Sequence, residues 1–60
     1  MNDNLPNDPI LLLSVVNMKL RDFYKDLDML CQDLNVNKEE LIEKLADIDY
    51  EYDEVTNQFV

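Results

Sequence analysis

The chain has 60 residues, 47% of them hydrophobic, and its five basic and fourteen acidic residues give a net charge of −9. This length allows a single domain, residues 1–60, with a small core and modest stability. The negative charge repels phosphate groups, so we expect neither direct nucleic-acid binding nor attachment to an anionic membrane surface.

The composition also limits how so small a fold can be supported. Cys31 is the only cysteine, which excludes an internal disulfide. A zinc site is poorly supported, because the chain has no histidine and no second thiol. We therefore expect no metal and no cofactor. Small domains without such supports often oligomerise, which makes self-association the remaining route.

The cellular location follows from two observations. A single cysteine suits a reducing compartment, and no basic residue precedes the apolar run of residues 10–13, as one would in a secretory signal. That run is also much shorter than the about 20 residues that cross a membrane. We expect a cytoplasmic protein without a membrane segment.

Residues 1–7 predict an extended arm, in which Pro6 interrupts regular structure. Residues 8–48 predict three helices. Asp8 can cap the first of these and Pro9 suits its first position, so we expect a helix from Pro9 to about Tyr24. Its core face comprises Leu12, Leu13, Val16, Leu20, Phe23 and Tyr24.

A second apolar stripe runs along the opposite side of this helix and consists of Leu11, Val15 and Met18. Apolar residues on both sides of a helix must be buried somewhere. Either the arm and the hairpin cover the stripe, or it pairs with another molecule. We treat these three residues as a candidate interface.

Between the two stripes lies a polar seam of Ser14, Asn17 and Arg21, spaced i, i+3, i+7. Three interpretations remain open for it. The seam can be solvated, Asn17 can hold the backbone of the hairpin, or the three side chains can form a small polar recognition site.

The next two helices are joined by a tight turn. Asp26 can cap the second helix, and Asn35 can take the left-handed conformation that ends it. Asn37 can cap the third helix, with Glu40 completing a capping-box pattern. The buried positions of these helices are Leu27, Leu30, Cys31, Leu34, Leu41, Ile42, Leu45 and Ile48.

From residue 49 the period changes from helical to alternating, which predicts a β-hairpin over residues 49–60. Tyr50 and Tyr52 alternate with acidic residues, residues 53–57 form the turn, and Asn57 suits a positive φ. The predicted fold is mainly α: a three-helix, helix-turn-helix-like bundle with a short C-terminal β-hairpin, the outline of a minimal winged helix.

The chain resembles a small bacterial family known as domain of unknown function number forty-two fifty. The resemblance implies a stand-alone cytoplasmic protein without an assigned activity or catalytic residues. A glycine often precedes the first aromatic residue of the tail in that family, where this chain has Asp49. The resemblance rests on Asn4-Leu5-Pro6, Asp8-Pro9, Leu12-Leu13-Ser14, Val16-Asn17, Lys19-Leu20-Arg21-Asp22, Tyr24, Leu27-Asp28, Leu30-Cys31, Glu39-Glu40-Leu41, Lys44-Leu45, Tyr50, Tyr52-Asp53 and Asn57-Gln58-Phe59.

These observations favour a non-catalytic function. The chain has no histidine and no glycine-rich phosphate loop, and Cys31 has no base to activate it. We therefore expect a non-enzymatic protein–protein interaction module, with no small-molecule substrate, that self-associates through the first helix as a homodimer. The alternative is a transcription-associated helix-turn-helix DNA-binding domain. Its reading helix would expose Lys38, Glu39, Glu43 and Asp47, a set that opposes contact with phosphates.

Overall fold

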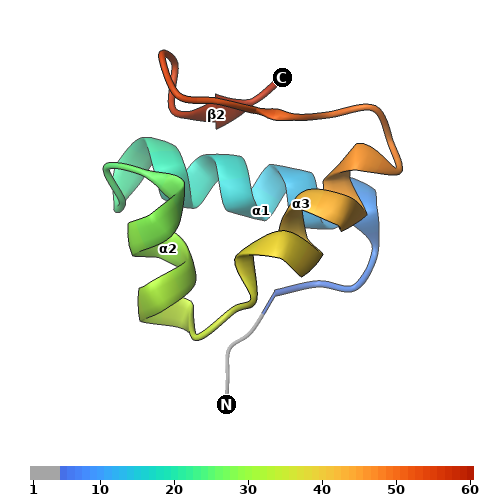
Figure 1. Ribbon diagram of the computed structural model, residues 1–60, viewed down its shortest axis with the longest axis horizontal. Coiled ribbons are helices and arrows are strands. Elements are labelled where there is room, and N and C mark those ends of the chain that lie inside the picture. The colour runs from blue at the N-terminus through green and yellow to red at the C-terminus, as the bar shows by residue number, and fades with distance from the viewer. Residues whose placement is uncertain (1–4) are drawn as a thin grey trace.

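The computed structural model of the chain describes residues 5–60. The first four residues of the predicted arm lie outside this range. Helices α1 (Pro9–Asp22), α2 (Leu27–Leu34) and α3 (Lys38–Ala46) are followed by strands β1 (Tyr52–Asp53) and β2 (Gln58–Phe59). The prediction of a mainly α fold with a C-terminal hairpin is confirmed (Figure 1).

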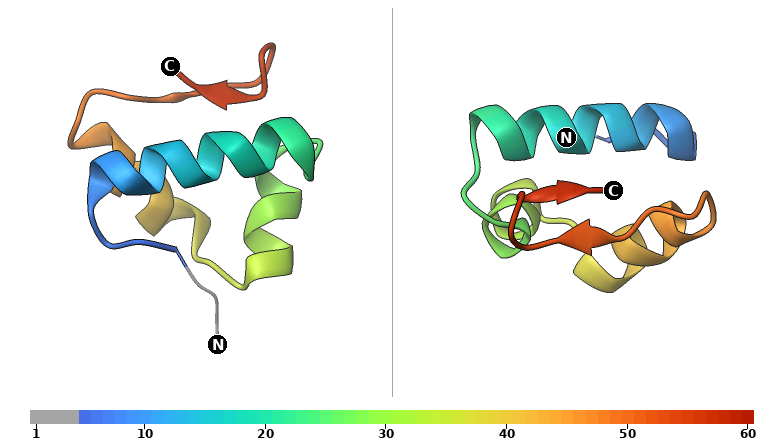
Figure 2. Two further views of the ribbon diagram at one scale, coloured as in Figure 1. Left: turned by 180° about the vertical axis from the view of Figure 1, so that it is seen from behind. Right: turned by 90° about the horizontal axis from the view of Figure 1, so that it is seen from above.

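The hairpin is antiparallel, with Tyr52 opposite Phe59. Two backbone hydrogen bonds between Glu51 and Val60, at 3.0 and 2.8 Å, continue the pairing by one residue. The hairpin lies across the helices, and α1 forms an outer layer with the other elements on one side of it (Figure 2). Only one side of α1 therefore faces the rest of the described chain.

Local side-chain chemistry sets the helix boundaries much as predicted. Asp8 accepts a hydrogen bond from the Ile10 amide at 3.2 Å. Asp26 accepts one from Met29 at 2.8 Å and Asn37 one from Glu40 at 3.1 Å. These N-caps satisfy amides that have no partner within their own helix.

Three residues with positive φ allow the chain to turn without glycine. Asn35 ends α2 with φ 57° and Asn57 closes the hairpin turn with φ 57°, as the sequence predicts. The third is Asp49, with φ 67°, where the chain leaves α3. A glycine at this position, which the resemblance implies, would adopt the left-handed backbone without strain.

The core lies between α1, the two shorter helices and β2. Phe59 brings the hairpin into it at 2% exposure, and its ring packs at 5.5 Å and a tilted angle on that of Tyr52. The remaining buried residues are Leu12, Val16, Leu20, Leu27, Leu30, Cys31, Leu41 and Leu45. The core thus draws on every helix, and Phe59 is the buried residue that the hairpin contributes to it.

The prediction that Phe23 belongs to this core is wrong. Helix α1 ends at Asp22, and Phe23 departs from helical geometry with φ −126°. Its side chain is 67% exposed, and its ring lies 5.9 Å below the Lys19 ammonium group. Helical spacing placed Phe23 on the core face, but the helix ends one residue before it, so its side chain is not buried.

Candidate interaction surface

The outer stripe, Leu11, Val15 and Met18, lies on the surface of α1. Leu11 is 56% exposed and Met18 is 36% exposed, while Val15 is partly buried. The partly buried residues that pack on the core cluster, such as Leu13 and Tyr24, do not include Val15. The spacing i, i+4, i+7 places the stripe along one line of the helix.

Neither the described part of the arm nor the hairpin covers this stripe. Residues 5–7 of the arm border a small cavity of about 100 Å³ with Leu12, Val36 and Leu41, on the core side of α1. The hairpin bonds to the Asn17 side of the helix. Within residues 5–60 Leu11 and Met18 are therefore exposed to solvent, and Val15 is partly exposed.

The polar seam does not form one site. Ser14 is exposed, and Arg21 turns along the surface to make a two-point ion pair with Asp22 at 3.0 and 3.1 Å. Hydrogen bonding from Arg21 lowers the pKa of the Asp22 carboxyl group. Asn17 points elsewhere, toward the hairpin, so the three side chains that share the seam do not converge.

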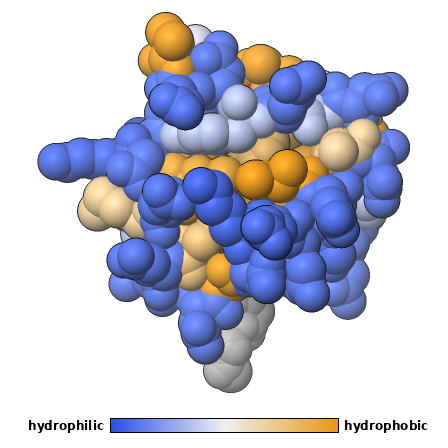
Figure 3. Space-filling view, viewed as in Figure 1, coloured by the Kyte–Doolittle hydropathy of each residue, from blue (hydrophilic) through white to orange (hydrophobic). Residues whose placement is uncertain are grey.

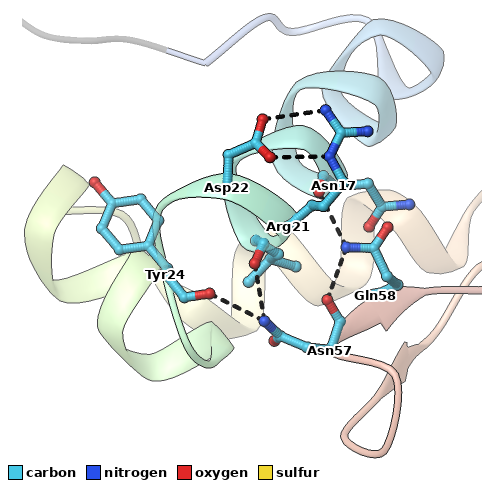
Figure 4. A network of polar contacts seen from close by, with 7 residues as sticks. Asn17, Arg21, Asp22, Tyr24, Asn57 and Gln58 are labelled. Atoms are coloured by element: carbon cyan, nitrogen blue, oxygen red, sulfur yellow. Dashed lines mark hydrogen bonds and ion pairs between the residues drawn. The ribbon is translucent and has the colours of Figure 1, made fainter.

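Asn17 holds the backbone of β2. Its side-chain oxygen accepts a hydrogen bond from the Phe59 amide at 2.8 Å, and its side-chain nitrogen donates to the Phe59 carbonyl at 3.1 Å. Gln58 completes the junction, because its side-chain nitrogen donates to the Asn17 carbonyl at 3.0 Å (Figure 4). Of the three interpretations of the seam, the one in which Asn17 fastens the hairpin describes these bonds.

Asn57 makes a second junction, at the end of α1. Its side-chain nitrogen donates to the carbonyls of Leu20 and Tyr24, both at 3.0 Å (Figure 4). Its side-chain oxygen accepts a hydrogen bond from the Tyr52 hydroxyl at 2.6 Å. We call Asn17, Asn57 and Gln58 the amide cluster. The side chains of Asn17 and Asn57 both donate and accept hydrogen bonds within the fold, so these groups are already engaged.

A second apolar surface escaped the sequence analysis. Phe23 and Met29, which is 44% exposed, line an open groove of about 410 Å³ with Tyr24, Gln32 and Asp33. The Tyr24 hydroxyl donates to Asp33, and this hydrogen bond raises the pKa of Tyr24. The one signal in the sequence is that Met29 falls outside the apolar spacing of its helix.

Charge is distributed unevenly around these surfaces. Helix α1 carries two basic residues, Lys19 and Arg21, and one acidic residue, Asp22, in a chain whose net charge is −9. The exposed side of α3 carries Glu39, Glu43 and Asp47 among others, and its Lys38 is paired with Asp28 at 2.7 Å. The face formed by α2, α3 and the hairpin is mostly hydrophilic, with an apolar band below the hairpin and smaller apolar patches elsewhere (Figure 3). The surface of α1 is thus the least acidic part of the helical framework.

Cys31 is a free cysteine, and it is buried. Burial raises the pKa of the Cys31 thiol, which keeps it protonated and unreactive. Among residues 5–60 no three His, Cys, Asp or Glu side chains gather as metal ligands would. No helix in the same range has the length and apolar character needed to cross a membrane.

Comparisons with known proteins agree with the resemblance seen in the sequence. A family model described as "Domain of unknown function (DUF4250)" matches residues 6–59, which is nearly the whole chain. A search of curated proteins and a search of solved structures each gave no match.

Proposed function

We propose that this chain, which belongs to the family described as Domain of unknown function (DUF4250), is a non-enzymatic protein–protein interaction module that self-associates through the outer stripe of α1. The observation that carries the proposal is the exposure of Leu11 and Met18 on one line of a helix whose opposite side is fully buried. An apolar stripe of this kind on a small protein marks an interaction surface.

Energetics set the expected strength of the association. Burying a large apolar side chain contributes about 1.5–3 kcal/mol, and association itself costs about 4 kcal/mol or more. A standard interface buries about 800 Å² on each partner, which is about a fifth of the 4173 Å² surface of this chain. Three apolar residues from each copy bury less area than a standard interface. We therefore expect a dissociation constant in the micromolar range.

Electrostatics favour α1 as the surface on which two copies meet. Each copy carries a net charge of −9, so most approaches bring like charges together. The basic residues Lys19 and Arg21 make α1 an exception. We include a cytoplasmic location in the proposal, because Cys31 is a free buried thiol that suits a reducing compartment.

The test is the molar mass in solution, measured by light scattering and sedimentation equilibrium across the micromolar range. We expect the mass of the native protein to rise with concentration toward about twice the 7.1 kDa of one chain, and the mass of Val15→Glu to stay that of the monomer. Val55→Glu is the matched control, because it makes the same substitution at a residue that is 93% exposed in the hairpin turn. A native chain that stays monomeric throughout this range contradicts the proposal.

The DNA-binding alternative gains no support from the arrangement of α3. Its exposed side presents Glu39, Glu43 and Asp47, and Lys38 is engaged by Asp28. Phosphate contacts need a basic surface, and their contribution is largest at low salt. A mobility shift with duplex DNA at low salt would revive this alternative, and we expect none.

A further inference from the structure

The outer stripe has an internal symmetry that depends on the spacing of its residues. Its midpoint along α1 lies between Ser14 and Val15. Leu11 stands three residues before Ser14, and Met18 stands three residues after Val15. At about 100° per residue, Leu11 and Met18 lie only about 20° apart around the helix. The two large apolar side chains are therefore placed evenly on either side of one point on one face.

From this spacing, and resting on the proposed function, we infer that two copies pair through α1 as an antiparallel homodimer. Its two-fold axis passes between Ser14 and Val15, and Leu11 of one copy packs on Met18 of the other. A two-fold interface uses the same patch on both subunits, so the patch must complement itself. When the second helix runs in the opposite direction about this midpoint, Leu11 of each copy lies level with Met18 of the other copy.

The centre of the stripe suits close contact. Ser14 is exposed and small, and Val15 is short and partly buried. In an antiparallel pair with its two-fold axis at this midpoint, Ser14 of one copy lies beside Ser14 of the other. Val15 of one copy likewise lies beside Val15 of the other. Short side chains at the crossing point allow helix axes to approach to about 8–10 Å, the usual distance for packed helices.

Charge selects the antiparallel direction over the parallel one. The C-terminal half of α1 carries Lys19, Arg21 and Asp22, a net charge of +1, while Asp8 lies exposed at its N-terminus. A parallel pair would place the basic ends of both helices together. An antiparallel pair places the basic end of each helix near Asp8 of the other copy, and it also opposes the two helix dipoles.

Two other surfaces within residues 5–60 are less suited to pairing between copies. The exposed side of α3 is acidic, so contact between two α3 helices brings like charges together. The groove beside Phe23 and Met29 includes the acidic Asp33, so two copies that meet there bring like charges together. The outer stripe, in contrast, combines apolar residues with opposite charges at the two ends of α1, so two copies can pair there about a two-fold axis.

Disulfide cross-linking can test the direction of the helices. In a Cys31→Ala background, single cysteines replace Leu11, Ser14 or Met18, and yields are measured after mild oxidation. A disulfide needs a Cα–Cα distance of about 4.4–6.8 Å. Seven residues of helix rise about 10.5 Å, so in the antiparallel dimer Leu11→Cys cannot bridge to itself. Cysteines at the exposed Val55 give the yield from random collision.

The expected result has two parts. Ser14→Cys forms a homodimeric disulfide well above the Val55→Cys yield. A mixture of Leu11→Cys and isotope-labelled Met18→Cys gives the mixed disulfide severalfold more often than either self-paired product. Self-paired products of Leu11→Cys and Met18→Cys without the mixed one show a parallel pair and overturn the inference.

The inference and the proposed function fail in different ways. A native chain with the mass of a dimer but background yields at all three positions associates through another surface, which overturns the inference while self-association stands. A native chain with the mass of a monomer overturns the proposed function, and the inference falls with it.

Discussion

The two long sides of α1 differ in how completely the fold uses their side chains. On the inner side, Leu12, Val16 and Leu20 are at most 2% exposed, and beside them Asn17 bonds both backbone groups of Phe59. On the outer side, Leu11 and Met18 are at least 36% exposed. A single helix thus carries a face that determines folding and a face that the described chain leaves free.

The comparison shows why polar residues on a helix are poor guides to a binding site by themselves. Asn17 lies on the surface side of the core, in a position where a recognition residue could stand, yet both of its side-chain groups are satisfied within the fold. The apolar residues on the far side have no such role. In this protein the candidate for function is the apolar stripe that the core does not need.

The largest expected effect separates two adjacent leucines. Leu12→Ala should lower the free energy of unfolding by about 2–5 kcal/mol, because Leu12 is buried in the core and its loss leaves a cavity. Leu11→Ala, the same substitution one residue earlier, should change the stability of the monomer by less than about 1 kcal/mol. Urea denaturation followed by circular dichroism measures both values.

The self-association of the same two variants completes this test. Leu11→Ala should weaken the dimer, measured by sedimentation equilibrium at a concentration where the native chain is half associated. Equal losses of stability in the two variants would show that the outer side of α1 is part of the core after all.

The next effect concerns the junction with the hairpin. Asn17→Ala removes two hydrogen bonds and leaves the Phe59 amide and carbonyl without their partner. A backbone group left without its partner costs about 1–3 kcal/mol when it is buried. These two groups are only partly buried, so each falls in the lower half of that range and we expect a loss of about 2–4 kcal/mol. Thermal unfolding measures the loss.

Ser14→Ala is the control for this variant, because Ser14 belongs to the same seam and is exposed. It should change stability by less than about 0.5 kcal/mol. A recognition role for the seam, rather than a structural one, would instead appear as an unchanged melting temperature for Asn17→Ala.

The two left-handed asparagines provide a smaller and sharper comparison. Asn35 and Asn57 both have φ 57°, so glycine suits the backbone at either position. Asn57→Gly also removes the bonds to Leu20, Tyr24 and Tyr52. We expect a loss of about 1–2 kcal/mol for Asn57→Gly and a change within about 0.5 kcal/mol for Asn35→Gly, both from urea denaturation. Equal effects would mean that Asn57 serves only as a turn residue.

Local chemistry made most of the fold predictable. Asp8, Asp26 and Asn37 act within three residues of their own positions, so their capping bonds could be assigned from sequence spacing alone. The left-handed turns at Asn35 and Asn57 were equally local. The same was true of the outer stripe, because its helical spacing does not depend on any distant residue.

The contacts that were not predicted join residues far apart in the chain. Asn17 and Phe59 are 42 positions apart, so the sequence left three interpretations of Asn17 open. The end of α1 is closed by Asn57 across 37 and 33 positions. Helical periodicity contains no information about that cap, and it therefore placed Phe23 in a core that the helix does not reach.

The smallest expected effect is a gain in stability that leaves association unchanged. Asp49 has φ 67° where the chain leaves α3, and a residue with a β-carbon is strained in that conformation. Asp49→Gly should raise the free energy of unfolding by about 0.5–1 kcal/mol, which corresponds to a melting temperature higher by roughly 2–8 °C for a domain of this size. Asp47→Gly is the control, because Asp47 has φ −61° and glycine there should destabilise the chain.

Because Asp49 lies outside α1, its substitution isolates folding from pairing. Asp53→Asn is the reference, because it has the same net charge as Asp49→Gly. The more stable Asp49→Gly variant should have the same dissociation constant as this reference when both are measured by sedimentation equilibrium. If association strengthened along with stability, the dimer would depend on how firmly the hairpin is held. The two sides of α1 would then be coupled through the fold, and the outer stripe would no longer be an independent surface.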